Sequence, residues 1–328
     1  MMGGSRSSVR HLPPARPLRS PSSLTALSSA FRPALGAAID AAEKLPGLFQ
    51  TLRNWPNGTK SGAGDKSPFF ARGDNGRAVL CLHGFSGTPF EVRPLAEAFA
   101  AQGFTTLAPV LAGHCGTVED LAATGHVDWL ASARRALETL RAQTDGGPVA
   151  VAGFSLGGLL ALRLCRAFPT EVAAAAIMAA PLRLAPYQVA GLRAIARLPR
   201  LLRRGPLFAL PKTNGFDVTD EKMAALNPSL PAMPLAGVMS LLELGEIVRT
   251  ELPTIKTPVI VVHGARDHTV PFEDSLELCG TIGSPVVERL WLERSGHLLA
   301  IDVERRTLID NVTRFFGQYL LPSGKANP

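Results

Sequence analysis

The residues best suited to covalent chemistry in this chain lie in the pentapeptide Gly153-Phe154-Ser155-Leu156-Gly157. The apolar run 149–152 comes directly before it and predicts a buried strand. The stretch 156–168 is rich in Leu and Ala and predicts a helix, which Pro169 ends. A sharp strand-to-helix turn flanked by glycines presents one side chain in a strained backbone conformation. Ser155 is therefore a candidate nucleophile.

A serine hydroxyl is a weak nucleophile at neutral pH, so it needs a base and an acid that orients the base. The expected chain order at a site of this kind is Ser, then Asp or Glu, then His. Asp267 follows a predicted strand at 258–262, and His297 follows another at 286–292. Because the carboxyl ends of parallel strands share one edge of a sheet, we predict a catalytic triad of Ser155, Asp267 and His297.

Acyl transfer to a serine also requires hydrogen-bond donors for the oxyanion that forms. We predict two backbone N–H groups, one from Leu156, which follows the nucleophile, and one from Phe85, in the loop 83–88. Each donor of this type is typically worth about 10²–10³ in rate. Asp302 has two interpretations: it orients the loop that carries His297, or it begins the last helix.

The elements that must position these residues alternate regularly between strand and helix. The predicted strands are 78–82, 105–109, 149–152, 172–180, 258–262 and 286–292, and the predicted helices are 89–102, 128–142, 156–168, 272–279 and 304–320. This alternation is typical of an α/β protein with a mostly parallel, doubly wound sheet. The alternation of strand and helix is interrupted at 182–252. Helical patterns at 188–204 and 234–249 predict a helical insertion there, which would lie over the carboxyl ends of the strands as a lid.

The composition changes along the chain predict its division into segments, and 57–76 has the composition of a turn-rich linker. We expect a disordered Arg/Ser/Pro-rich extension (1–31), amino-terminal helices and a linker (32–67), an α/β core in two parts (68–181 and 253–321), the helical lid (182–252) and a short tail (322–328).

The composition of the 328 residues is that of a globular protein, with 46% hydrophobic and 19% charged residues. The longest uncharged apolar run, 172–181, is too short to span a bilayer. The four cysteines show no pair spacing, which favours reduced thiols and a cytoplasmic location. The Arg- and Ser-rich, acid-free residues 1–31 give the alternative of import into an organelle.

Positive charge is concentrated in two stretches. Residues 1–39 hold five arginines, and 183–212 hold six arginines and one lysine, with no acid in either stretch, although the whole chain has a net charge of only +7. The remainder is therefore acidic, which argues against nucleic acid as a partner. The arginines of 188–204 recur at helical spacing opposite apolar residues, so this helix has either a solvated face or a weak contact with a membrane surface.

Six stretches carry a resemblance to a known family: 80–88, 109–116, 125–129, 153–158, 261–271 and 284–302. They resemble the α/β-hydrolase superfamily, and more narrowly the small bacterial carboxylesterases and monoacylglycerol lipases that have a compact helical lid. The resemblance implies a serine esterase that works through an acyl-enzyme. Ser155 would attack the carbonyl, His297 would transfer the proton and Asp267 would hold the imidazole, with no metal or organic cofactor.

The apolar side chains of the lid predict a pocket for an acyl chain. Tentative lining residues are Leu192, Ile195, Leu207, Phe208, Leu235 and Met239. A lid of this length favours a small ester substrate, namely a short- to medium-chain monoester such as a monoacylglycerol. The alternatives are an acyltransferase or thioesterase on the same fold, and a non-catalytic binding protein. The sequence carries no signal for the oligomeric state.

Overall fold

The computed structural model describes residues 62–183, 209–212 and 215–320. Several sequence predictions lie outside these residues: the extension 1–31, the helices predicted before residue 62, the first lid helix at 188–204 with its basic face, and the tail 322–328. Within the described residues, no helix combines the length and the apolar character needed to cross a membrane.

A seven-stranded sheet forms the centre of the molecule, in the order β1-β3-β2-β4-β5-β8-β9. Neighbouring strands run parallel except for β1, which pairs antiparallel with β3. The strands are β1 (Phe69–Ala71), β2 (Ala78–Leu82), β3 (Thr105–Ala108), β4 (Val149–Phe154), β5 (Val172–Met178), β8 (Val259–Gly264) and β9 (Val287–Leu292). This confirms the predicted mostly parallel, doubly wound sheet.

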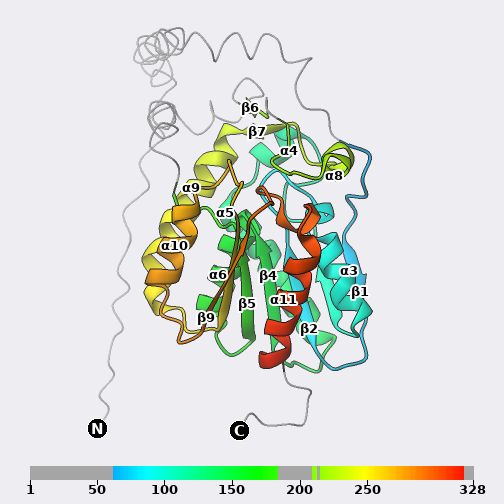
Figure 1. Ribbon diagram of the computed structural model, residues 1–328, viewed down its shortest axis with the longest axis vertical. Helices are drawn as coiled ribbons and strands as arrows, with labels where there is room; N and C mark the ends of the chain where they lie inside the picture. The colour runs from blue at the N-terminus through cyan, green and yellow to red at the C-terminus, as the bar shows by residue number, and fades with distance from the viewer. Residues whose placement is uncertain (1–61, 184–208, 213–214, 321–328) are drawn as a thin grey trace, which may run out of the picture. The chain divides into compact units, whose positions relative to one another are not determined.

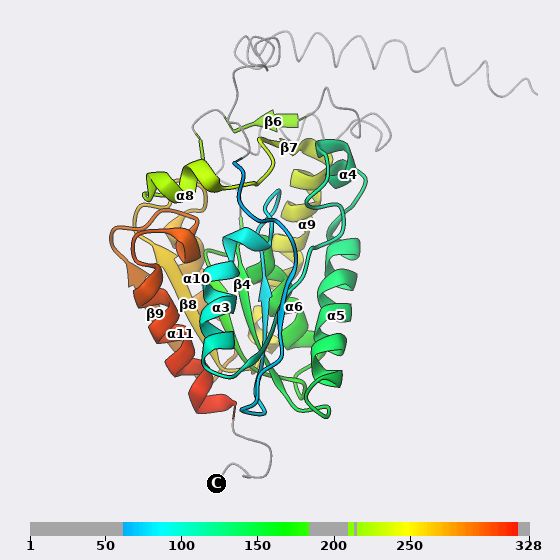
Figure 2. The same ribbon diagram turned by 90° about the vertical axis from the view of Figure 1, so that its right-hand side faces the viewer.

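Helices cover both faces of this sheet, with α3 and α11 on one side and α5 and α6 on the other (Figure 2). The long helices are α3 (Arg93–Ala101), α5 (His126–Ala142), α6 (Leu156–Ala167), α9 (Leu235–Glu251), α10 (Phe272–Thr281) and α11 (Arg305–Tyr319). Short helical turns are η2 (Pro89–Glu91), α4 (Val118–Ala122), α8 (Glu221–Leu226), η5 (Leu252–Thr254) and η6 (Leu299–Ile301).

The central strands read as continuous apolar runs because each of their faces contacts a different hydrophobic core. In β4, Val149 and Val151 pack into the core beneath α5 and α6, whereas Ala150 and Ala152 pack into the core beneath α3 and α11. Side chains alternate across a strand, so a strand buried on both faces needs apolar residues at every position.

The insertion between β5 and β8 contains a small sheet in addition to helices. β6 (Ala209–Pro211) pairs antiparallel with β7 (Ala232–Pro234), and α9 follows β7 directly. The second predicted lid helix, 234–249, thus corresponds to α9. The views in Figures 1 and 2 both show β6, β7, α4 and α8 gathered at one end of the main sheet.

The prediction of a turn-rich linker at 57–76 is wrong in its second half, because β1 lies within it. Phe69 pairs with Ala108 of β3, which makes β1 the antiparallel edge of the sheet. The chain before β1 is bound to the insertion between β5 and β8: the N–H groups of Gly62 and Gly64 donate to the carbonyl oxygens of Asn227 (2.7 Å) and Leu226 (2.8 Å).

Candidate active site

Ser155 lies at the turn between β4 and α6, in a conformation that few residues other than glycine adopt, with φ 53° and ψ −115°. Its N–H donates to the carbonyl oxygen of Met178 (2.8 Å), which ties the turn to β5. A Cβ atom at Gly153 would collide with the backbone of Gly157, and one at Gly157 would collide with the carbonyl oxygen of Leu82. The two glycines therefore allow the close backbone approach that the strained turn requires.

The three residues of the predicted triad come together at the carboxyl end of the sheet. The Nε2 atom of His297 lies 3.1 Å from Ser155 Oγ, and its Nδ1 atom lies 2.8 Å from Asp267 Oδ2. Asp267 is on the loop after β8, and His297 is on the loop between β9 and η6. A hydroxyl, an imidazole and a carboxylate in this order can carry a proton from the serine to the histidine.

Both oxygens of the Asp267 carboxylate are engaged. Oδ1 accepts the backbone N–H groups of Thr269 and Val270, each at 2.8 Å. Oδ2 lies between His297 Nδ1 and a second imidazole nitrogen, His263 Nε2, at 3.2 Å. Burial opposes ionisation of this carboxyl, but the two histidines and these hydrogen bonds outweigh it and hold the pKa of Asp267 far below its usual range.

His263 is fully buried at the end of β8, and its Nε2 atom contacts the Asp267 carboxylate. Its Nδ1 atom lies 2.7 Å from the hydroxyl of Ser275, and its Nε2 atom lies 3.2 Å from the carbonyl oxygen of Val270. A proton on Nε2 suits both the carbonyl and the carboxylate, while Nδ1 accepts from the serine hydroxyl. His263 can therefore orient Asp267 without taking part in proton transfer itself.

The pKa of His297 results from two opposing effects. Burial favours the neutral imidazole, but the Asp267 carboxylate, with smaller contributions from Asp217 and Glu91, raises the pKa of His297 above its ordinary value. A base whose pKa lies above the usual value for histidine is a stronger proton acceptor, provided that the pH is high enough to keep it neutral.

Asp217, in the segment after β6, links the acid and base loops. Its Oδ2 accepts the N–H of His268 and the hydroxyl of Thr269, each at 2.8 Å. Its carbonyl oxygen accepts the N–H of Leu298 at 3.0 Å. Both neighbours of the triad, His268 after Asp267 and Leu298 after His297, are thus bound to a single residue of the insertion.

Asp302 orients the loop that carries His297, which decides between its two interpretations. Its fully buried carboxylate accepts the N–H of Gly296 at 2.7 Å, and also those of Thr219 (2.9 Å) and Asp220 (3.0 Å). Helix α11 begins only at Arg305. Sequence reasoning missed Asp217, Thr219 and Asp220, whose contacts with these loops span 51 to 83 residues along the chain.

The two predicted oxyanion donors are the backbone N–H groups of Leu156, directly after the nucleophile, and of Phe85, in the loop after β2. Leu156 is the first residue of α6, so its N–H has no acceptor within the helix. Phe85 lies in the loop after β2, and its ring packs against Trp129 with 5.5 Å between ring centroids. Neither N–H donates to any described residue. Both groups have the character that an oxyanion hole requires.

His83 supports the loop that contains Phe85. The N–H of Leu111 donates to its Nε2 (3.2 Å), so the ring carries its proton on Nδ1, which donates to the carbonyl oxygen of Gly84 (3.0 Å). Burial, with the neighbouring His114, lowers the pKa of His83 to about 3, so the ring is neutral in ordinary solution.

The predicted pocket residues of the lid are described only in part. Leu192, Ile195, Leu207 and Phe208 lie outside the described residues. Leu235 is buried, and Met239 is half-buried against the core beneath α5 and α6. Helix α9 approaches the predicted oxyanion loop (83–88) closely, because a Cβ atom at Gly237 would lie 2.6 Å from the Phe85 ring. The start of α9 therefore covers Phe85.

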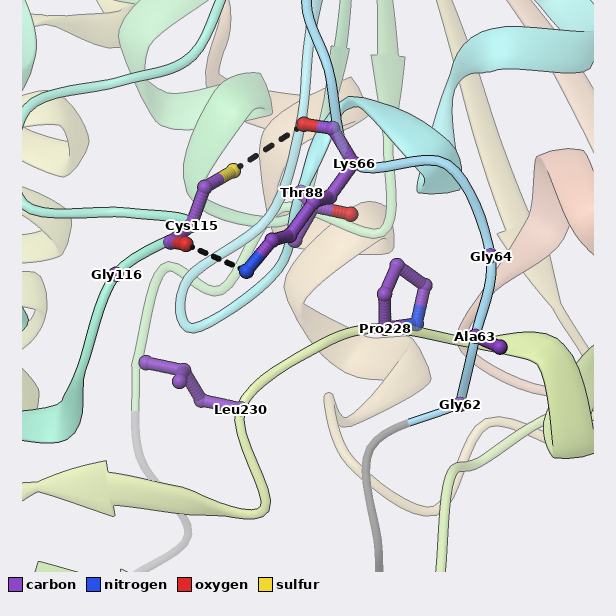
Figure 3. Close-up of a pocket in the computed structure, with 9 residues that line it drawn as sticks. All are labelled: Gly62, Ala63, Gly64, Lys66, Thr88, Cys115, Gly116, Pro228 and Leu230. Atoms are coloured by element: carbon purple, nitrogen blue, oxygen red, sulfur yellow. Dashed lines mark hydrogen bonds between the residues drawn. The ribbon is translucent and has the colours of Figure 1, made fainter.

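A cavity of about 280 Å³ lies beside the predicted oxyanion loop and is lined in part by its residue Thr88 (Figure 3). One of its walls joins two segments, since Lys66 Nζ donates to the carbonyl oxygen of Cys115 at 2.9 Å. None of the triad residues lines it. Its lining residues are Gly62, Ala63, Gly64, Lys66, Thr88, Cys115, Gly116, Pro228 and Leu230. In the described part of the chain, no group of three His, Cys, Asp or Glu residues is arranged to hold a metal ion.

Comparisons with known proteins extend over most of the chain. The sequence model of the alpha/beta hydrolase family matches residues 79–308. The thermostable monoacylglycerol lipase of Bacillus sp. (strain H-257) is 31% identical over 253 residues, which are 77% of this chain and 94% of the relative. The carboxylesterase of Bacillus subtilis (strain 168) is 28% identical over 249 residues, covering 76% and 95% of the two chains.

Solved structures give the same fold. A chain from the study of LipS and LipT, two metagenome-derived lipolytic enzymes, matches with a TM-score of 0.70 and 28% identity, over 79% of this chain and all of the other. The monoacylglycerol lipase of Paleococcus ferrophilus matches with a TM-score of 0.64 over 78% of this chain and 99% of the other. Its identity of 16% shows the fold alone.

Proposed function

Because this chain belongs to the alpha/beta hydrolase family and is an ester-hydrolysing enzyme, we propose that Ser155, His297 and Asp267 are its catalytic triad. The observation that carries the proposal is the continuous set of contacts from Ser155 Oγ to His297 Nε2 (3.1 Å) and from His297 Nδ1 to Asp267 (2.8 Å). It begins at a serine held in a strained turn, which is where a nucleophile of this family is expected.

The geometry supports a reaction through an acyl-enzyme. Ser155 Oγ attacks the ester carbonyl carbon while His297 Nε2 takes its proton, and the Asp267 carboxylate accepts a hydrogen bond from the Nδ1–H of the resulting imidazolium. The N–H groups of Phe85 and Leu156 bind the oxyanion. The intermediate expels the alcohol, which receives the proton from His297. A water molecule then attacks the acyl group with His297 again as base, releasing the carboxylic acid and restoring Ser155.

The substrate in this proposal is a short- to medium-chain monoester, with monoacylglycerols included. The support is the relationship to a monoacylglycerol lipase and a carboxylesterase, together with an apolar lid helix, α9, placed over the Phe85 loop. Each additional buried methylene contributes roughly 0.8 kcal/mol, so binding should strengthen with acyl length until the pocket is full.

The nucleophile is tested with Ser155→Ala. This variant should lose both ester hydrolysis and labelling by a fluorophosphonate probe, and it should melt at the same temperature as the wild type. Ser67→Ala, which changes an exposed serine, is the matched control and should label fully. Stoichiometric labelling of the Ser155→Ala protein would overturn the assignment.

The substrate class is tested separately with 4-nitrophenyl esters and glycerides from C2 to C18. We expect kcat/KM to rise from C2 to a maximum at medium length, and emulsified triolein to be a poor substrate. A flat profile, or a preference for acetate or for triolein, would refute the substrate class but would leave the Ser155 assignment to its own test.

A further inference from the structure

A buried carboxylate outside the triad lies directly against the oxyanion loop. Glu91, in the turn η2, is only 4% exposed. Its Oε2 accepts the N–H of Gly84, the residue before Phe85, at 3.0 Å. Its Oε1 lies 2.9 Å from the hydroxyl of Ser229, which is 138 residues further along the chain. The side chain thus joins the oxyanion loop to the segment between α8 and β7.

The loop is built around this carboxylate. A Cβ atom at Gly87 would collide with both oxygens and the carboxyl carbon of Glu91, so the loop backbone lies against the charged group. The segment between α8 and β7 also binds the loop after Phe85, since Leu230 N–H donates to the carbonyl oxygen of Ser86 at 2.9 Å. Gly84, Ser86 and Gly87 are therefore fixed by Glu91 and its neighbours on both sides of Phe85.

Burying a carboxylate is unfavourable unless its partners compensate for the lost water. Burial raises the pKa of Glu91, while the nearby Lys212 ammonium and the hydrogen bonds from Ser229 and Gly84 oppose that rise. In turn, burial lowers the pKa of Lys212 to about 8. The buried Glu91 carboxylate loses its hydration and takes no part in proton transfer. We therefore expect its role to lie in the positions of the groups that it binds.

We propose that Glu91 is a positioning residue that aims the Phe85 N–H at the oxyanion, and that Ser229 extends this support to the segment of the insertion between α8 and β7. The proposal rests on the oxyanion role given above to Phe85. Glu91 does not touch the substrate; it holds the peptide plane that precedes the donor.

The role requires hydrogen bonds and not a negative charge, and this separates two substitutions. In Glu91→Gln, the amide oxygen can accept from Gly84, and the amide nitrogen can donate to the Ser229 hydroxyl. That hydroxyl can then donate to Asn227 Oδ1, which lies 2.7 Å away. In Glu91→Met, a side chain of similar length offers the Gly84 N–H no acceptor, and the loop is free to turn away.

The expected result is a fall in kcat for Glu91→Met of between about 10- and 100-fold, with KM changed by less than about threefold. The fall is smaller than the roughly 10²–10³ that removing an oxyanion donor costs, because the donor is displaced and not removed. Glu91→Gln should keep kcat within about threefold of the wild type. Glu97→Gln, which removes an exposed carboxylate from the adjacent helix α3, is the control and should be unchanged.

A second readout separates positioning from a merely structural role. Ser155 adds to a trifluoromethyl ketone and forms a tetrahedral adduct that carries an oxyanion. The inhibition constant of such a ketone should therefore rise in Glu91→Met by the same factor by which kcat falls, at an unchanged KM. Wild-type kcat in Glu91→Met, or equal losses in Glu91→Gln and Glu91→Met, would overturn the proposal.

If Glu91→Met does not fold, the Ser229→Ala variant tests the proposal instead. It leaves the Gly84 contact intact and should lower kcat about three- to tenfold at constant KM. An unchanged kcat would refute the link to the segment between α8 and β7. Failure of the proposed function looks different, because the wild type itself would then show neither fluorophosphonate labelling nor ester hydrolysis.

Discussion

Replacing Asp267 with asparagine should abolish most of the activity while keeping the shape of the site. The structure fixes which way the new amide will point. One carboxylate oxygen accepts the N–H groups of Thr269 and Val270, each at 2.8 Å, and only an oxygen can keep both bonds. The amide nitrogen must therefore take the place of Oδ2, where it faces His297 Nδ1.

The consequence of this orientation is a histidine in the wrong tautomer. An NH₂ group 2.8 Å from Nδ1 donates to it, so the imidazole carries its proton on Nε2. That proton points at Ser155 Oγ, 3.1 Å away, and the ring cannot accept the serine proton. In serine proteases the corresponding change lowers kcat by about 10⁴, which corresponds to about 5 kcal/mol of transition-state stabilisation. We expect a loss of similar size here.

The assay is kcat and kcat/KM with a 4-nitrophenyl ester, together with a melting curve. The matched control is Glu293→Gln, which removes an exposed carboxylate from the loop between β9 and η6 and should leave kcat unchanged. A loss of less than tenfold in Asp267→Asn would contradict the reasoning. A large loss in Glu293→Gln alone would move the role of the acid to Glu293.

Two further predictions concern the base and the nucleophile turn. Burial lowers the pKa of His297, but the nearby carboxylates raise it by more, so the net shift is upward from the ordinary value of about 6.5. Because protonated His297 cannot act as a base, kcat/KM should fall as the pH drops through this raised pKa. Asp217→Asn removes one of these negative charges and should move that fall to lower pH; an unmoved profile would count against the electrostatic account. Gly157→Ala should lower the melting temperature and kcat because its Cβ would collide with the Leu82 carbonyl oxygen. Gly317→Ala, in α11 with open space around it, should instead raise stability by about 0.5–1 kcal/mol, and equal effects of the two changes would refute this.

The main sheet could be predicted because its strands leave strong local signals. Buried parallel strands are continuous apolar runs bounded by glycine, proline or polar residues, and Ala78–Leu82 is such a run with the bounds that the structure has. The three-residue strands lack that signal. Phe69–Ala71 stands among Gly, Ser and Asp residues, and Ala209–Pro211 and Ala232–Pro234 each end in proline. Only their pairing with distant segments makes them strands.

The candidate site divides in the same way. The order of Ser155, Asp267 and His297 and their positions after strands are visible in the sequence, so their meeting could be predicted. Asp217 and Glu91 could not. Asp217 binds loops 51 to 81 residues away, and Glu91, which is seven residues from Gly84, also contacts Ser229, 138 residues away. Each is read locally as an ordinary loop or helix-start acid. One signal for Glu91 was available: it is the single charged residue of the stretch 89–92, whose other members, Pro89, Phe90 and Val92, are apolar.

The contacts of the segment 217–220 set limits on how this protein can be recombined with its relatives. A chimera that exchanged the whole insertion as a cassette would remove the carboxylate that binds His268 and Thr269. It would also remove two of the N–H groups that compensate the buried charge of Asp302. A junction placed before Asp217 leaves these contacts in place. In evolutionary terms, residues 217–220 must change together with the loops after β8 and β9.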